Sequence, residues 1–159
     1  MSGRRLTVLA ASLVLAALLV PLSQARTEST ATVKILSVLS GYTPHDVAPS
    51  GASPGDWIIE RDRLYNLVPQ FGQPKGAFVG TDSAVVKVDP SMQTATFHGV
   101  SHLAGGTITA GGRIPIQTNG VVTLKILGGT GRFAHARGTV VIRSSDARHA
   151  TNTFRLTLR

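Results

Sequence analysis

The sequence has no cysteine and little aromatic content, and each shortage excludes a class of protein. Because none of the 159 residues is cysteine, the fold cannot depend on disulfides or thiolate metal ligands. Only 5% of the residues are aromatic, and apart from Arg4 and Arg5 the Lys and Arg residues are scattered singly. Proteins that bind nucleic acids usually concentrate basic charge on one face and add stacking aromatics. We therefore expect no nucleic-acid partner, and we interpret the net charge of +8 as a solvated basic surface.

The longest apolar run resembles a targeting segment. Arg4 and Arg5 precede a predominantly apolar run over residues 6–20, and residues 23–25 (Ser-Gln-Ala) have the small-x-small pattern that a signal peptidase recognises. The run is shorter than the ~20 residues that span a bilayer, although a retained anchor remains the alternative. We expect residues 1–25 to be a signal peptide, the mature protein to be secreted, and no stable membrane anchor to remain.

The rest of the chain lacks a helical period and alternates short apolar runs with turn signals. After a polar tail over residues 26–32, the pattern predicts eight strands. They lie within residues 33–40, 56–66, 77–89, 94–103, 106–114, 121–127, 132–144 and 151–158. Such a series indicates an all-β barrel or sandwich. A barrel of eight strands is wide enough inside for side chains or for one small ligand.

A glycine-rich segment is the most informative part of the chain. The apolar run 124–127 enters residues 128–131 (Gly-Gly-Thr-Gly), where we expect a tight turn because glycine adopts positive φ at little cost. The alternative, a phosphate-binding loop, would need a Gly-Lys-Ser/Thr ending and a following helix, which the Arg-Phe continuation does not supply. The outgoing residues alternate between bulky and small, with Phe133, His135 and Arg137 on the bulky side. This alternation predicts a strand that begins directly after the turn.

This segment resembles the dirigent and allene oxide cyclase superfamily. Plant dirigent proteins carry a Gly-Gly-Thr-Gly-(Lys/Arg)-Phe-x-x-Ala-Arg-Gly run, which residues 128–138 reproduce almost residue for residue. Residues 55–65 are similar to the Gly-Asp…Leu-Tyr segment of allene oxide cyclases, and residues 79–83 to the start of their next strand. The resemblance covers about residues 33–158. It implies that residues 33–159 form a single eight-stranded antiparallel β-barrel.

Asp62 is the main candidate for catalysis. The resemblance implies an Asn or Asp at this position, near the mouth of the barrel. On the alternating pattern it shares a strand face with Glu60 and Leu64. A carboxyl group facing a partly apolar cavity has a raised pKa, which suits a general acid or base. The alternative is a solvated acid paired with Arg61 or Arg63.

Other residues complete the predicted ligand site. Asp82 lies on an otherwise apolar face, and we expect it at the rim of the barrel, in water, rather than paired inside. The remaining predicted ligand contacts are Trp57, Glu60, Tyr65 and His98, although the two aromatic residues could instead fill the core. His98 and His102 share a strand face but are separated by about 13 Å, too far to bind one metal ion. We expect neither a metal site nor a cofactor.

The sequence departs from the resembling families where their chemistry lies. Allene oxide cyclases use a Glu on the first strand and a Cys on the third, whereas residues 33–40 contain no acid and Val86 stands at or near the Cys position. Dirigent proteins place an acid before the glycine turn, where residues 123–126 have none. We therefore expect neither true allene oxide cyclase activity nor plant-type dirigent activity.

Two functions remain open from the sequence. One is a barrel that binds an apolar small molecule and acts as a cyclase, isomerase or coupling guide by orientation and water exclusion. The other is a non-catalytic extracellular binding or structural module, with a homodimer or homotrimer as its assembly. A deep cavity lined by Asp62 or Asp82 would favour the first function, and a barrel filled with side chains the second. A polyanion binder, the third class, would show strongly salt-dependent binding.

Overall fold

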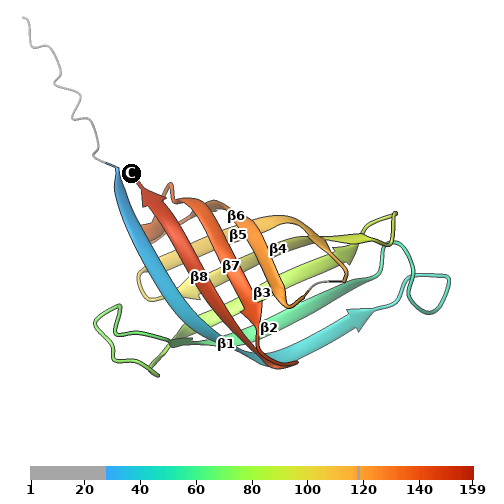
Figure 1. Cartoon of the computed structure of the whole chain (residues 1–159), viewed down its shortest axis with the longest axis horizontal. Helices are drawn as coiled ribbons and strands as arrows, with labels where there is room; N and C mark the ends of the chain where they lie inside the picture. The colour runs from blue at the N-terminus through green and yellow to red at the C-terminus, as the bar shows by residue number, and fades with distance from the viewer. Residues whose placement is uncertain (1–27, 118) are drawn as a thin grey trace, which may run out of the picture.

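The computed structural model describes residues 28–117 and 119–159, which form a closed antiparallel barrel of eight strands (Figure 1). Each strand pairs with its neighbours along the chain, and the ring closes where the last strand pairs with the first. The strands are β1 (Ser29–His45), β2 (Trp57–Asn66), β3 (Phe78–Val88), β4 (Thr94–Leu103), β5 (Gly106–Pro115), β6 (Val121–Gly129), β7 (Arg137–Ser144) and β8 (His149–Leu158). The barrel predicted from the sequence is confirmed.

The first strand is longer than predicted at both ends. The predicted signal peptide, residues 1–25, lies outside the described residues. β1 already begins at Ser29, so part of the predicted polar tail is strand, and it continues to His45 through an irregularity between Leu39 and Gly41. Within the described ranges, no helix has the length and the hydropathy needed to cross a membrane.

The glycine turn is tight, as predicted, but the strand after it begins later than predicted. Gly131 has φ 59°, and a Cβ there would lie 2.1 Å from the carbonyl oxygen of Gly105 in the β4–β5 turn. A short 3₁₀ turn, η1 (Gly131–Phe133), follows. Because Phe133 turns inward and is only 2% exposed while His135 is exposed, the predicted bulky strand face is wrong. β7 starts only at Arg137.

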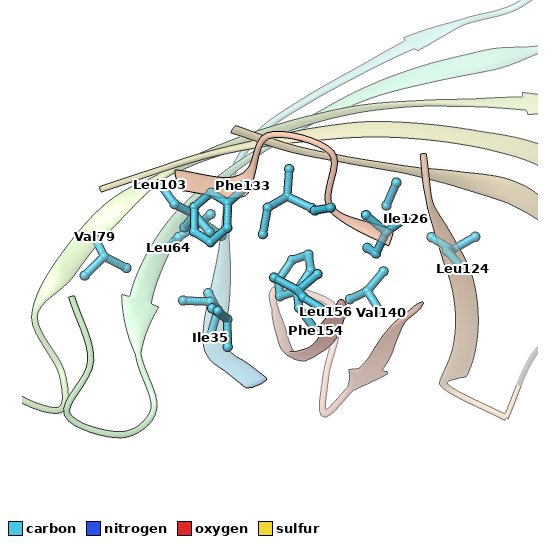
Figure 2. Packing of buried hydrophobic residues seen from close by; sticks show 14 residues of the cluster. Ile35, Leu64, Val79, Leu103, Leu124, Ile126, Phe133, Val140, Phe154 and Leu156 are labelled. Carbon is cyan, nitrogen blue, oxygen red and sulfur yellow. The ribbon is translucent and has the colours of Figure 1, made fainter. Parts of the chain in front are cut away.

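One half of the barrel interior is filled with apolar side chains, and we call it the filled half. Figure 2 shows these side chains converging from several strands, with Phe133 among them. Ile35, Leu64 and Ile108 are fully buried there. The ring of Phe71, from the β2–β3 connection, meets Phe133 edge-on with centroids 6.3 Å apart. This half therefore provides the packed core of the domain.

Candidate functional site

The other half of the barrel interior, the hollow half, contains a cavity of about 330 Å³. It lies toward the end that carries the long β1–β2 connection, opposite the end where β8 finishes (Figure 1). Its polar lining consists of Ser37, Glu60, Asp62, Asp82, Ser144 and Asn152. Its larger apolar side chains are Ile58, Val86, Phe97, Ile114, Val122 and Ile142. The lining comes from all eight strands, so the barrel itself builds the site.

Two aspartates face each other inside the cavity. Asp62 on β2 and Asp82 on β3 are direct partners in the antiparallel register, so their inward side chains are neighbours. The hydroxyl of Ser37 donates to Oδ2 of Asp62 at 2.5 Å, and the hydroxyl of Ser101 donates to Oδ2 of Asp82 at 2.5 Å. Each carboxyl group is thus oriented by a serine from the neighbouring strand, β1 for Asp62 and β4 for Asp82. The pair is fixed from both sides.

The electrostatics of the cavity favour the neutral form of its carboxyl groups. The pKa of Asp82 is raised to about 6, chiefly by burial, which the hydrogen bond from Ser101 opposes and the charges of Asp62 and Glu60 reinforce. Burial also raises the pKa of Asp62, opposed by the hydrogen bond from Ser37. The pKa of Glu60 is raised by burial first and by the charge of Asp62 second. Asp82 can therefore exchange protons close to neutral pH.

Three of the predicted site residues do line the cavity. Asp62 and Glu60 point inward on β2, as the alternation predicted, and the exposed Arg61 and Arg63 lie on the opposite face. Asp82 also faces inward, but the prediction that it sits at the rim in water is wrong. It is half-buried and bonded to Ser101, because the β3 register places it level with Asp62 rather than at a strand end. The catalytic role of Asp62 stays a prediction.

The other three predicted contacts lie on the outer face of the barrel. The ring of Trp57 stacks on His45 with centroids 3.6 Å apart, and Tyr65 meets Phe78 edge-on at 5.8 Å. His98 is exposed and does not line the cavity. Each of them occupies the strand position next to an inward residue, so the pleat turns it outward. Residue type alone suggests these three as ligand contacts, whereas strand parity decides which face a side chain joins.

Sequence reasoning missed three inward polar residues, two that bond to the aspartates and one that lines the cavity beside them. Ser37, Ser101 and Asn152 are all inward and at most 7% exposed. A signal for them exists, because each interrupts an otherwise apolar inward series: Ser37 follows Ile35, and Ser101 precedes Leu103. Phe97, which the sequence analysis does not single out, also lies in the cavity wall. Polar residues on an apolar face therefore mark the site better than aromatic ones do.

Neither metal chemistry nor a serine nucleophile has a built site in the described part of the chain. Across residues 28–117 and 119–159, no group of three His, Asp or Glu side chains is placed to hold a metal ion. Residues 51–55 match the Gly-x-Ser-x-Gly pattern of hydrolase nucleophiles, which sequence reasoning overlooked. Yet Ser53 lies in an irregular loop, is 2% exposed, and donates to the Val47 carbonyl and to Asp56. Its role is to hold the loop.

Comparisons with known proteins agree with this architecture. The sequence model of the family described as "Dirigent-like protein" matches residues 56–159. A pyocyanin demethylase structure is similar, with TM-score 0.67, 23% identity, and coverage of 79% of this chain and 99% of that one. So is an exo-specific intermolecular Diels-Alderase, with TM-score 0.65, 13% identity, and coverage of 82% and 98%.

A pterocarpan synthase dirigent protein is also similar, with TM-score 0.61, 16% identity, and coverage of 83% of this chain and 88% of that one. At such identities the likeness shows the fold alone. A search of curated protein sequences gave no significant match. The family match, however, covers well over half of the chain and includes both the cavity aspartates and the glycine turn. The chain belongs to the dirigent-like protein family.

Proposed function

We propose that the protein binds a largely apolar small molecule in the barrel cavity and catalyses an acid–base reaction on it, such as a cyclisation or an isomerisation. The observation that carries the proposal is the cavity with Asp62 and Asp82 side by side in its wall. The structural neighbours whose names include a demethylase, a Diels-Alderase and a pterocarpan synthase support it, because all of them act on small organic molecules by name. A cavity of this size is at the small end of ligand-binding sites.

The chemistry would depend on position and on proton exchange. The apolar walls would hold the molecule and exclude water, and the barrel strands would keep it fixed against the aspartates. Near neutral pH an ionised Asp82 could take a proton from the bound molecule. A neighbouring carboxyl group in its protonated form could return one. Both steps use groups that the cavity already contains.

Binding is tested with Nile red, a neutral apolar dye whose fluorescence rises in apolar surroundings. We expect the wild-type protein to enhance the fluorescence, and Ala150→Leu to abolish the effect because the larger side chain fills the cavity. Thr151→Leu is the matched control, because residue 151 is the next position along β8 and faces outward. Equal fluorescence with both variants would show that the dye does not enter the barrel, and would contradict the proposal.

The acid–base part is tested by proton abstraction from nitrobenzisoxazole, a neutral aromatic probe that opens when a base removes its ring proton. We expect elimination by the wild-type protein to rise with pH through about 6, as Asp82 ionises. Asp82→Asn should lower kcat/KM by at least about 10-fold, within the range of general-base effects. Glu28→Gln, an exposed acid at the opposite end, should leave the rate unchanged. Dye binding without any Asp82-dependent elimination would leave the protein a non-catalytic binding module.

A further inference from the structure

Charge inside the cavity has one sign. Glu60, Asp62 and Asp82 all contribute carboxyl groups to the wall, and no Lys, Arg or His is among the described residues that line it. The chain as a whole carries a net charge of +8, so this interior is acidic within a basic protein. Among the described residues, the ion pairs join Asp89 to Arg113, Asp146 to His149 and Glu28 to Arg159, and none includes a cavity acid. The positive partner of these carboxyl groups is not supplied by the barrel wall.

Hydrogen-bond acceptors in the cavity also lack donors. Oδ1 of Asp62 and Oδ1 of Asn152 are both buried and have no hydrogen-bond partner. Asn152 is 7% exposed, so this amide is a built part of the wall rather than a surface group. The hydroxyl groups of Ser37 and Ser101 are already donated to the aspartates. Buried acceptors are nearly always satisfied in folded proteins, so these two oxygens indicate a missing donor.

We propose that the cavity accepts an apolar molecule bearing a protonated amine, whose N–H groups would meet the unpaired oxygens of Asp62 and Asn152 and whose charge would face the three carboxyl groups. The inference rests on the binding function proposed above and names the class of molecule bound. An ammonium group supplies both things that the wall lacks, donors and positive charge. A neutral alcohol would supply only a donor, and a carboxylate neither.

The apolar part of the cavity sets the rest of the molecule. Ile58, Val86 and Ile142 offer aliphatic walls, and Phe97 adds an aromatic ring that attracts a nearby cation. With about 330 Å³ available, the apolar body is limited to a small ring system. The favoured ligand is therefore a small aryl or alicyclic amine.

Charged groups at the mouth modulate this preference without removing it. Arg148 and His149, from the β7–β8 turn, line an adjoining hollow of about 120 Å³ together with Glu60, Asp62 and Asp146. His149 is held by Asp146, with Nδ1 2.9 Å from Oδ1, and Asp146 has a lowered pKa because the Arg148 backbone N–H and the His149 ring bond to it. Asp146 thus holds the imidazole of His149 at the mouth and adds a further acid there.

The experiment compares three probes of one shape: phenylbutylamine, phenylbutanol and phenylbutanoate, each competing with Nile red at pH 7.5. We expect the amine to displace the dye at a concentration at least about 10-fold lower than the alcohol, and the carboxylate to be weakest. Asp62→Asn and Asp82→Asn should each reduce the advantage of the amine and leave displacement by the alcohol unchanged. Glu28→Gln, the exposed acid at the opposite end, should alter none of the three.

Lowering the pH to 5 should also reduce the advantage of the amine, because Asp82 then gains a proton while the amine stays charged. The same comparison in His149→Gln separates this effect from any contribution of the histidine at the mouth. Equal displacement by the amine and the alcohol would overturn the inference and leave the proposed binding function intact. If Nile red does not enter the wild-type cavity at all, the binding function fails first, which the Ala150→Leu comparison reports independently.

Discussion

The filled half and the hollow half of the barrel are built from the same strands but serve different purposes. Moving one inward position along a strand changes an apolar residue into a polar one in four of the strands. The pairs are Ile35 and Ser37, Leu64 and Asp62, Leu103 and Ser101, and Phe154 and Asn152. The first member of each pair packs in the core, and the second stands at the cavity or supports it.

This division separates stability from chemistry. The filled half buries a cluster of apolar side chains, so it holds the fold. The hollow half leaves a cavity and brings acids of like charge together, both of which cost stability. The chain tolerates this cost because the two regions share continuous strands, and hydrogen bonds between strands run through both. Differences between matched variants in the two halves can test the comparison directly.

The largest effect is expected for truncations in the filled half. Leu64 and Ile58 lie on the same face of β2, but Leu64 is 0% exposed in the core whereas Ile58 borders the cavity. We expect Leu64→Ala to lower the free energy of unfolding by about 3 kcal/mol, and Ile58→Ala by about 1 kcal/mol. Urea denaturation followed by tryptophan fluorescence measures both. Similar losses in the two variants would show that the halves are packed alike.

A gain of stability is expected from neutralising the hollow half. The pKa of Asp82 is about 6 in the folded protein, against an ordinary value of 3.8, so the folded state binds this proton more tightly than the unfolded state does. The contribution of Asp82 to the free energy of unfolding therefore falls as the pH rises from about 4 to about 6. A shift of this size corresponds to about 2–3 kcal/mol. Asp82→Asn should therefore stabilise the protein by about 2 kcal/mol at pH 7.5 and much less at pH 4.

Thermal unfolding of the wild type and Asp82→Asn at both pH values tests this expectation. Glu60 and Asp62, whose pKa values are also raised, act in the same direction and remain in the variant. Backbone hydrogen bonds from Val47 and Ser53 lower the pKa of Asp56. Side-chain hydrogen bonds from Thr94 and Thr96 lower the pKa of Asp89. These two aspartates therefore affect stability only at more acidic pH. If Asp82→Asn is less stable than the wild type at pH 7.5, burial of the ionised Asp82 does not destabilise the folded protein.

The smallest effect is expected on the outer face, which belongs to neither half. Phe97 and His98 are neighbours on β4, one lining the cavity and the other exposed. We expect Phe97→Ala to weaken Nile red binding by about 10-fold, through lost contact area, and His98→Ala to change it by less than about 2-fold. Fluorescence titration gives both values. Equal effects from the two substitutions would place the dye on the outer surface.

The sequence predicts which face of its strand a side chain occupies, but it does not predict how far along the barrel axis that side chain lies. Alternation put Glu60 and Asp62 on the inward face of β2, because a pleated strand turns successive side chains to opposite sides. It could not say that Asp82 lies level with Asp62, since that depends on the register between β2 and β3. The serine that donates to Asp82 comes from β4, so local pattern could not reveal it.

The error at the glycine turn has a different physical origin. The alternation after Gly131 is real in sequence, but a contact from far along the chain decides the local conformation: the backbone N–H of Arg132 donates to the Gly105 carbonyl at 2.8 Å. That bond, together with the inward burial of Phe133, holds a 3₁₀ turn where a strand was expected. Tertiary contacts therefore override local periodicity at this end of the barrel.

The pairing of β8 with β1 has a consequence for how the chain folds. Ser29 is opposite Leu158, so the last hydrogen bonds of the ring join residues almost the whole described length apart. Such non-local contacts slow folding, because the entropy of a long loop is lost before they form. Until β8 arrives, β1 and β7 present open edges and the acidic interior stays in contact with water. During synthesis, the closed cavity can exist only after β8 has been made.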